Sequence, residues 1–133
     1  MLRFDFHARH ADAVSQQLRA AATVSERRLV NATYDWAQSR VVRKLVVKPY
    51  PPKRPNQRYV RTFRMQARWK ADPAQGGARI YNEQPYAGHV VGDGEGRGQA
   101  YMHVGRWWLA RSEIEAERPK LRDALVRGMD RQL

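Results

Sequence analysis

Residues 45–69 read LVVKPYPPKRPNQRYVRTFRMQARW, and they separate a helical part of the chain from a β-rich part. Four prolines fall close together in this stretch, namely Pro49, Pro51, Pro52 and Pro55. Proline lacks a backbone N–H and pushes the residue before it away from helical angles. We therefore expect a helix to end at Lys48, and residues 48–58 to form an extended, polyproline-like loop that can reach a neighbouring molecule.

Helical periodicity precedes this loop. Apolar residues recur three or four positions apart in two runs, Ala11, Val14, Leu18 and Ala21, then Val30, Tyr34, Ala37, Val41 and Leu45. Thr23 and Glu26 have the capping-box spacing, so Thr23 either starts a second helix or lies within one long helix that reaches Val47. Leu2 and Phe4 alternate with charged residues, which is typical of a short strand or an apolar anchor. Residues 1–47 are therefore predicted to be mainly helical.

After the loop, the residues of the stretch 59–69 fall on two alternating sides, as in a strand. One side of the stretch 59–69 carries Tyr59, Arg61, Phe63, Met65, Ala67 and Trp69, and the other carries Val60, Thr62, Arg64, Gln66 and Arg68. This pattern predicts a strand whose second side faces solvent or DNA. Asp72, Pro73 and the pair Gly76-Gly77 predict a turn into an antiparallel strand over 78–82. With a further strand over 101–108, residues 59–108 are predicted to be β-rich.

A terminal helix is predicted for residues 109–133. Ser112 and Glu115 repeat the capping-box spacing. Apolar residues at helical intervals follow, namely Ile114, Leu121, Leu125 and Met129. Pro119 either kinks this helix or begins its last segment. We therefore predict one α+β domain over 1–133, in which N-terminal helices and a C-terminal helix pack on a small antiparallel β-sheet that carries a long, proline-rich, basic loop.

Length and composition fit one soluble domain. The chain has 133 residues, 42% of them hydrophobic, which is enough for a single core. It contains no cysteine, so disulfides and thiolate metal sites are excluded. It has neither an apolar stretch long enough to span a membrane nor the apolar run of a secretory signal. We expect a protein that is made in the cytoplasm.

Positive charge is concentrated in one segment. Eleven Lys or Arg residues and no acidic residue lie between Asp35 and Asp72. Removing them from the 25 basic residues of the chain leaves fourteen against thirteen acidic ones, so this segment holds nearly all of the net charge of +12. Such a segment needs an anionic partner, which is either nucleic acid or an acidic protein surface.

The sequence contains no enzyme signature. The four histidines, His7, His10, His89 and His103, lack the further ligands that a metal site needs. The glycine-rich residues 92–98 lack the Gly-Lys-Ser/Thr ending of a phosphate-binding loop. A hydrolase or nuclease that uses His89, His103, Asp93 or Glu95 is disfavoured, because no motif fixes the geometry of these groups. We predict no catalytic residue, no metal and no cofactor.

Two groups of candidate binding residues follow from the charge and the aromatic residues. The DNA-facing candidates are Arg61, Arg64, Arg68 and Lys70. The candidates for contact between subunits are Tyr50, Pro51, Pro52, Lys53, Arg54, Arg58, Tyr59, Tyr86, Trp107 and Trp108. Trp107 and Trp108 would point to opposite sides of a strand, one into the core and one into an interface. The strands over 59–69 and 78–82 are expected to offer edges for pairing between subunits.

The order of three short segments resembles one protein family. These segments are Tyr59-Val60-Arg61-Thr62-Phe63-Arg64-Met65, then Tyr86-Ala87-Gly88-His89-Val90, then Gly105-Arg106-Trp107. In this order, and after a proline-rich loop, they resemble the small neck and tail-component proteins of tailed bacteriophages, which are the head–tail joining and tail-completion families. The chain departs from the family where Phe63 replaces a glycine and where Gly88-His89 replaces Pro-Tyr.

The resemblance implies a non-enzymatic virion protein. It implies a homo-oligomeric ring, six or twelve copies around the DNA channel, at the junction between portal and tail. The implied partners are other phage neck, tail and portal proteins, with non-specific contact to DNA and no membrane. The alternative is a free nucleic-acid-binding module without sequence specificity, which the charge and the interleaved aromatic residues also predict.

Overall fold

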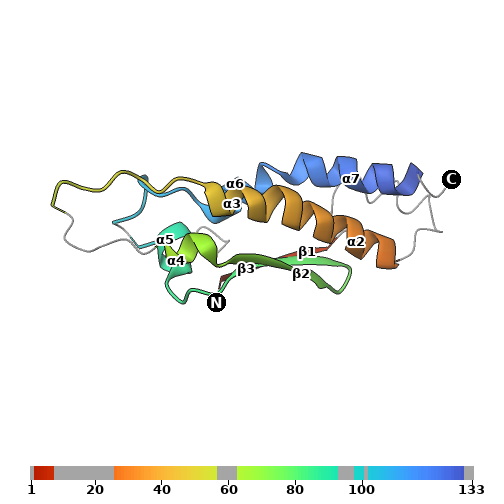
Figure 1. The fold of residues 1–133 in the computed structure, drawn as a ribbon, viewed down its shortest axis with the longest axis horizontal. Helices are drawn as coiled ribbons and strands as arrows, with labels where there is room; N and C mark the ends of the chain where they lie inside the picture. Colours follow the sequence, from red (N-terminus) through yellow and green to blue (C-terminus); the bar gives the residue numbers. More distant parts are fainter. Residues whose placement is uncertain (1, 8–25, 57–62, 93–97, 101, 131–133) are drawn as a thin grey trace.

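A small antiparallel sheet and a set of helices make up the fold (Figure 1). The structure is a computed structural model, and it describes residues 2–7, 26–56, 63–92, 98–100 and 102–130. The strands are β1 (Leu2–His7), β2 (Trp69–Ala74) and β3 (Gly77–Asn82). The helices are α2 (Glu26–Trp36), η2 (Ala37–Val42), α3 (Arg43–Val47), α4 (Arg64–Ala67), α5 (Ala87–Val91), α6 (Ala110–Glu115) and α7 (Arg118–Asp130). The predicted α+β class is confirmed.

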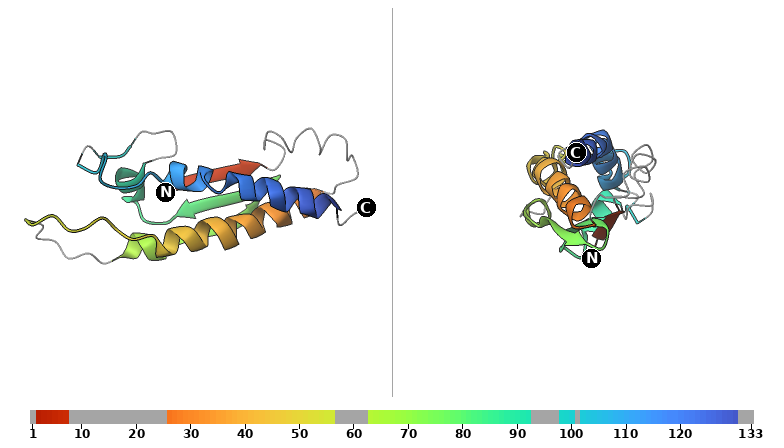
Figure 2. Two further views of the ribbon diagram at one scale, coloured as in Figure 1. Left: turned by 90° about the horizontal axis from the view of Figure 1, so that it is seen from above. Right: turned by 90° about the vertical axis from the view of Figure 1, so that its right-hand side faces the viewer.

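The two long helical elements cover one face of the sheet. Seen end-on, α2 and α7 lie side by side above the strands (Figure 2). Alternate residues of the strands are buried against these helices, notably Phe4, Ile80 and Trp69. The core is completed from the helices by Leu29, Trp36, Val41, Leu45, Ile114, Leu121 and Leu125.

Of the two alternatives predicted from Leu2 and Phe4, a short strand or an apolar anchor, the structure shows the strand, and this strand pairs with β3. The sheet order is β1-β3-β2, so β3 is the central strand and both of its edges are occupied. The prediction that residues 78–82 offer a free edge to another subunit is therefore wrong. In the β1–β3 pair, Leu2 lies opposite Asn82 and His7 lies opposite Gly77. The alternation of residues along the sequence does not reveal this pairing, because the two strands are far apart in the chain.

The turn between β2 and β3 is shorter than predicted. It consists of Gln75 and Gly76, and Gly76 has a φ of +72°, which glycine adopts without strain. A Cβ atom on Gly76 would also overlap the His7 ring. Asp72 and Pro73 belong to β2 rather than to the turn. Proline is tolerated there because β2 is an edge strand.

The long helix runs from Glu26 to Val47 as α2, η2 and α3, and η2 is a π-helix. Its end at Val47 confirms the prediction, since Lys48 has an extended backbone with a ψ of 124°. The predicted apolar face is correct for Ala37, Val41 and Leu45. Before η2 the buried residues Leu29 and Thr33 lie one position ahead of the predicted Val30 and Tyr34, and Trp36 is buried beside Ala37. The wider turn of the π-helix accounts for this offset of one residue.

The predicted strand over 59–69 is wrong over residues 63–68, and only its last residue, Trp69, belongs to a strand, β2. Phe63 has a left-handed φ of 58°, and residues 64–67 form α4. Arg, Met, Gln and Ala are all good helix formers, and only Met65 of this helix is buried. Residues 59–62 of the prediction lie outside the described chain. The described residues of the segment 59–108 therefore contain two strands, β2 and β3, and two short helices, α4 and α5.

The predicted strand over 101–108 is also wrong in its described part. Residues 102–106 form turns, in which His103 accepts hydrogen bonds from the backbone N–H groups of Arg106 and Trp107 at 3.0 and 2.9 Å. Gly105 has a φ of +72°. These local bonds satisfy the backbone without a partner strand. Trp107 and Trp108 therefore do not alternate on a strand.

The C-terminal helical region is divided in two. Ser112 lies inside α6, which begins after Leu109, so the predicted cap at Ser112 is wrong. Pro119 is the second residue of α7, where its missing N–H costs nothing, and it begins the last helical segment rather than kinking it. The predicted core positions Ile114, Leu121 and Leu125 are buried. Three predicted features lie outside the described residues: the side chain of Met129, the helix over Ala11–Ala21, and the cap at Thr23.

Asn82 is a buried polar residue that fastens α4 to the end of β3. Its Nδ2 donates to the Met65 carbonyl at 2.7 Å, and its Oδ1 accepts from the Gln84 backbone N–H at 3.0 Å. Replacing Asn82 with alanine should lower the free energy of unfolding by about 1–3 kcal/mol, because the Met65 carbonyl and the Gln84 N–H lose their partner. Urea unfolding measures this loss. Asn31→Ala, at an exposed position on α2, should change stability by less than about 0.5 kcal/mol; equal losses would contradict the role of Asn82.

No helix in the described part of the chain combines the length and the apolar character needed to cross a membrane.

Candidate functional site

Carboxylates from the C-terminal helices neutralise part of the basic segment. Lys44 Nζ lies 3.2 Å from Glu113 and 3.4 Å from Glu117, and Lys48 Nζ lies 2.9 Å from Glu113. Burial acts to raise the pKa of Glu113, but the hydrogen bonds from Lys48 and Lys44 outweigh it and hold the pKa below its usual value. Part of the segment between Asp35 and Asp72, which has no acidic residue of its own, is therefore neutralised by carboxylates from elsewhere in the chain.

This cluster predicts a loss of stability in acid. Because the pKa of Glu113 is lower in the folded chain than its ordinary value of 4.5, its contribution is complete above pH 4.5 and disappears as the pH falls through the folded pKa. Glu113→Gln should remove up to about 1 kcal/mol at pH 7 and flatten the dependence of the unfolding free energy between pH 6 and 3. The matched control is Glu115→Gln, which removes the separate ion pair between Glu115 and Arg118. If the unfolding free energy of Glu113→Gln still falls between pH 6 and 3 as it does in the unmodified chain, this explanation is refuted.

The outer face of the sheet carries balanced charge. Arg68 and Lys70 both pair with Glu83, at 3.2 and 3.1 Å. The hydrogen bond from Lys70 lowers the pKa of Glu83, and Arg68 adds to this effect. On the same face Asp5 pairs with Arg3 and Arg79, and the hydrogen bond of Tyr81 to Asp72 raises the pKa of Tyr81.

Two of the four DNA-facing candidates are thus in ion pairs within the chain. Arg68 and Lys70 share Glu83. Arg64 is exposed on α4 and makes no ion pair with any described residue. Arg61 lies outside the described residues. Arg64, Arg68 and Lys70 therefore do not form a continuous strand face, because α4 and a turn at Arg68 precede β2.

The loop over residues 48–56 is held against the segment 98–109 at one end of the elongated molecule, on the left in Figure 1. Arg54 Nη2 donates to the Met102 carbonyl at 2.8 Å, and Arg106 Nη2 donates to the Pro52 carbonyl at 2.5 Å. Residues 48–54 form neither helix nor strand. We name the surface formed by residues 47–56, 63–67, 86–91, 98–100 and 102–109 the tip.

Tyr50 is the centre of the tip. Its ring lies 4.8 Å from the Phe63 ring and 4.7 Å from the Trp107 ring, measured between centroids. Its hydroxyl accepts a hydrogen bond from the Gln66 backbone N–H at 3.0 Å, and Gln66 Nε2 donates to the Lys48 carbonyl at 3.3 Å. One half-buried side chain therefore connects the loop, the start of α4 and the segment before α6.

The predicted contact residues are distributed unevenly over the tip. Pro52, Lys53, Arg54 and Tyr86 are exposed there, whereas Tyr50 and Pro51 are half-buried. Trp107 is buried, and Trp108 is half-buried with its ring 6.4 Å from Trp69 and under the Lys48 amine at 5.8 Å. Arg58 and Tyr59 lie outside the described residues.

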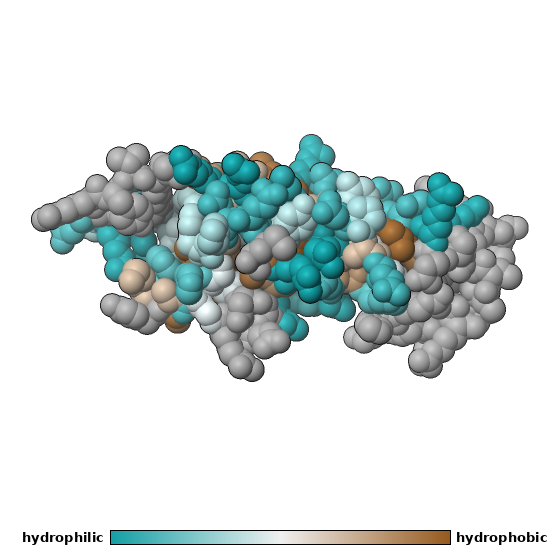
Figure 3. Space-filling model, turned by 90° about the horizontal axis from the view of Figure 1, so that it is seen from below, coloured by the Kyte–Doolittle hydropathy of each residue, from teal (hydrophilic) through white to brown (hydrophobic). Residues whose placement is uncertain are grey.

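Exposed apolar side chains are the feature that the sequence did not identify. The large hydrophobic residues that are exposed in the described part of the chain are Val47, Phe63, Tyr86, Met102, Val104 and Leu109, and all six belong to the tip. Val104 is 64% exposed and Val47 is 69% exposed. Figure 3 shows apolar atoms at the surface near this end, next to hydrophilic ones. A sequence signal for Val104 existed only as part of the incorrect strand over 101–108.

The tip also contains a histidine with a shifted pKa, His103. Burial lowers the pKa of His103, and the charges of Arg106 and Arg54 lower it further, so this imidazole is neutral at pH 7. His89 and His103 are connected through the backbone, since Ala100 N–H donates to the His89 carbonyl at 2.7 Å and His103 N–H donates to Ala100 at 2.8 Å. No group of three or more His, Asp or Glu residues in the described ranges is placed to hold a metal ion.

Comparison of the chain with protein-family models, with curated proteins and with solved structures finds no match.

Proposed function

We propose that this chain is a structural virion protein of a tailed bacteriophage that forms a ring at the head–tail junction, as a neck or tail-completion component around the DNA channel. The observation that carries the proposal is the concentration of exposed apolar side chains at the tip. Contiguous exposed apolar surface on a small protein is typical of a protein-binding site. Lys53 and Arg54 border it, so the partner surface is apolar with acidic groups around it.

The segments that resemble the phage family support this proposal by their position. Phe63 from the first segment packs on Tyr50, and Tyr50 packs on Trp107 from the third. His89, in the second segment, accepts a hydrogen bond from Ala100, which leads into the third. The described residues of these three segments are separate in sequence and converge at the tip, together with the proline-rich loop. A shared role in one interface explains why they occur in the same order.

A head-to-tail contact through the tip would generate a ring. The tip of one copy binds a different surface of the next copy, and such a contact closes when the rotation between copies permits. Six or twelve copies would then surround the channel, with other neck, tail and portal proteins above and below. In this proposal the chain is a non-enzymatic protein without a cofactor, and it resides in the virion.

A free nucleic-acid-binding module is the second candidate function. It is favoured by a basic groove between α2 and α7, because such a groove needs no assembly to bind a polyanion. Under this alternative the isolated chain is a monomer that binds DNA in a strongly salt-dependent manner. The two candidates therefore differ in the oligomeric state of the functional protein.

Light scattering during size-exclusion chromatography, together with imaging of assembled particles, tests the proposed function. The account expects a ring-sized mass under assembly conditions and density for the chain at the neck or tail of the particle. A strictly monomeric protein that is absent from virions would refute it. DNA binding by that monomer would then support the second candidate.

A further inference from the structure

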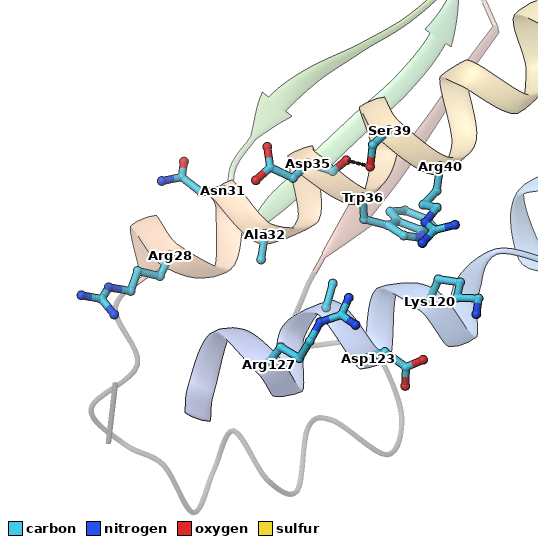
Figure 4. A pocket seen from close by; sticks show the side chains of 11 residues that line it. Arg28, Asn31, Ala32, Asp35, Trp36, Ser39, Arg40, Lys120, Asp123 and Arg127 are labelled. Carbon is cyan, nitrogen blue, oxygen red and sulfur yellow. Dashed lines mark hydrogen bonds between the residues drawn. The ribbon is translucent and has the colours of Figure 1, made fainter. Parts of the chain in front are cut away.

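A polar groove runs between the long helix and α7 (Figure 4). Its volume is about 500 Å³. Two cations lie toward each end, Arg40 and Lys120 at one end, Arg28 and Arg127 at the other. Asp35 and Asp123 lie between these pairs. The groove therefore has four positive charges and two negative ones, contributed by both helices.

Three of the four cations of this groove are available to a ligand. Arg40, Lys120 and Arg127 are exposed, and none of them forms an ion pair with another residue in the described ranges. On the outer face of the sheet, by contrast, Arg68 and Lys70 share a carboxylate. Within the described chain, unpaired positive charge thus lies on the helical layer as well as at Arg64, whereas the suggested positions Arg68 and Lys70 are paired.

The chemistry of the lining favours a nucleic acid over a protein. Protein interfaces are built around buried apolar and aromatic side chains, whereas nucleic-acid interfaces are more polar and strongly positive. None of the six exposed large hydrophobic residues belongs to the groove, because all of them belong to the tip. The molecule therefore separates an apolar surface for protein contact from a cationic surface for a polyanion.

The spacing of the cations matches a short length of duplex. Arg28 and Arg40 are twelve residues apart, which corresponds to about 18 Å along a helix. This distance spans about five base pairs at 3.4 Å per step. The four cations can therefore contact up to about four phosphates.

We propose that the groove between α2–η2 and α7 binds the sugar–phosphate backbone of duplex DNA through Arg28, Arg40, Lys120 and Arg127, without reading its sequence. The proposal names the DNA-contacting face within the proposed function and rests on it. Asp35 and Asp123 repel the phosphates between the two cation pairs, so they limit the strength of the contact. A weak contact suits a duplex that must move past the protein.

The test is binding of a fluorescent 20-base-pair duplex by the purified full-length chain at several salt concentrations. For the unmodified chain, the slope of log affinity against log salt should be about −4, since each phosphate contributes about −0.9. The double variant Arg40→Glu/Arg127→Glu should weaken binding at least tenfold at low salt and reduce the slope to about −2. Arg64→Glu/Arg68→Glu changes the net charge equally and should weaken binding less than threefold.

Two further measurements show whether the change in DNA binding is specific to the groove. Asp35→Asn/Asp123→Asn removes the repulsion and should tighten binding several-fold, which a merely structural role for these carboxylates would not produce. Melting temperatures close to that of the unmodified chain should accompany both charge variants. Equal losses in the two arginine double variants, or a larger loss in Arg64→Glu/Arg68→Glu, would overturn the proposal.

Competition separates a phosphodiester ligand from an acidic protein. Unlabelled duplex should displace the fluorescent duplex, and polyglutamate of equal charge should do so at least tenfold less effectively. Equal competition would overturn the assignment to nucleic acid and assign the groove to an acidic protein segment. These measurements use the isolated chain, so a failed groove assignment with intact rings in virions would leave the proposed function standing.

Discussion

Replacing Tyr50 with alanine should lower the free energy of unfolding by about 2–4 kcal/mol and release the loop from the tip. The Tyr50 ring fills the space between Phe63 and Trp107, with centroids at 4.8 and 4.7 Å, and alanine would leave a cavity there. Urea unfolding measures the loss of stability. Trypsin reports on the loop, because the bond between Lys53 and Arg54 should be cleaved faster once Tyr50 no longer anchors it.

Tyr50→Phe is the control for this prediction. It keeps the ring and removes only the hydroxyl that accepts the Gln66 N–H, so the loss should be about 1 kcal/mol and the rate of cleavage should change little. Similar stability for Tyr50→Ala and the unmodified chain would show that the tip is not organised around this residue.

Placing a charge on the exposed apolar surface should abolish assembly without unfolding the chain. Val104 is 64% exposed, so Val104→Asp costs little in the isolated molecule. In an interface the same carboxylate would be buried without a partner, which weakens association at least about 100-fold. Light scattering should therefore give the mass of a monomer where the unmodified chain gives that of a ring.

Gln38→Asp is the matched variant for the assembly experiment. Gln38 is exposed on η2, outside the tip, and the substitution changes the net charge by the same amount. It should assemble as the unmodified chain does. Loss of assembly in both variants would mean that net charge, rather than the apolar tip, controls association.

Local patterns in the sequence predicted the elements whose causes are local. The alternation at Leu2 and Phe4 gave β1, the pair Lys48-Pro49 gave the end of the long helix, and Pro119 gave the start of α7. Each of these depends on backbone chemistry or on burial within a few residues. The spacing of Leu121 and Leu125 likewise identified the buried side of α7.

Tertiary context overrode the pattern elsewhere. Alternation around Met65 suggested a strand, but α4 buries Met65 while Asn82, from the end of β3, holds its carbonyl. The π-helix η2 moved the apolar face before it by one residue, and no sequence period encodes such an insertion. The sequence did not show that the positive charge between Asp35 and Asp72 is partly neutralised, because Glu113, which pairs with Lys48, is far away in sequence.

The candidate site was predictable only in part. The proline-rich loop lies in the tip, and the predicted residues Tyr50, Arg54 and Trp107 are all found there. The exposure of Val104 could not be predicted, because it depends on turns between residues 102 and 106. The groove cations were overlooked, since they come from two helices that are adjacent only after folding.

Thiol labelling tests the central claim that the tip is buried when the chain assembles. The chain contains no cysteine, so Val104→Cys introduces a single reactive group at the tip and Arg122→Cys introduces one on the exposed part of α7. The measurement is the rate of maleimide labelling in the free chain and in purified virions. The account predicts that Cys labelling at position 104 slows at least tenfold in virions while labelling at position 122 changes less, whereas equal rates at position 104 in the two states would contradict it.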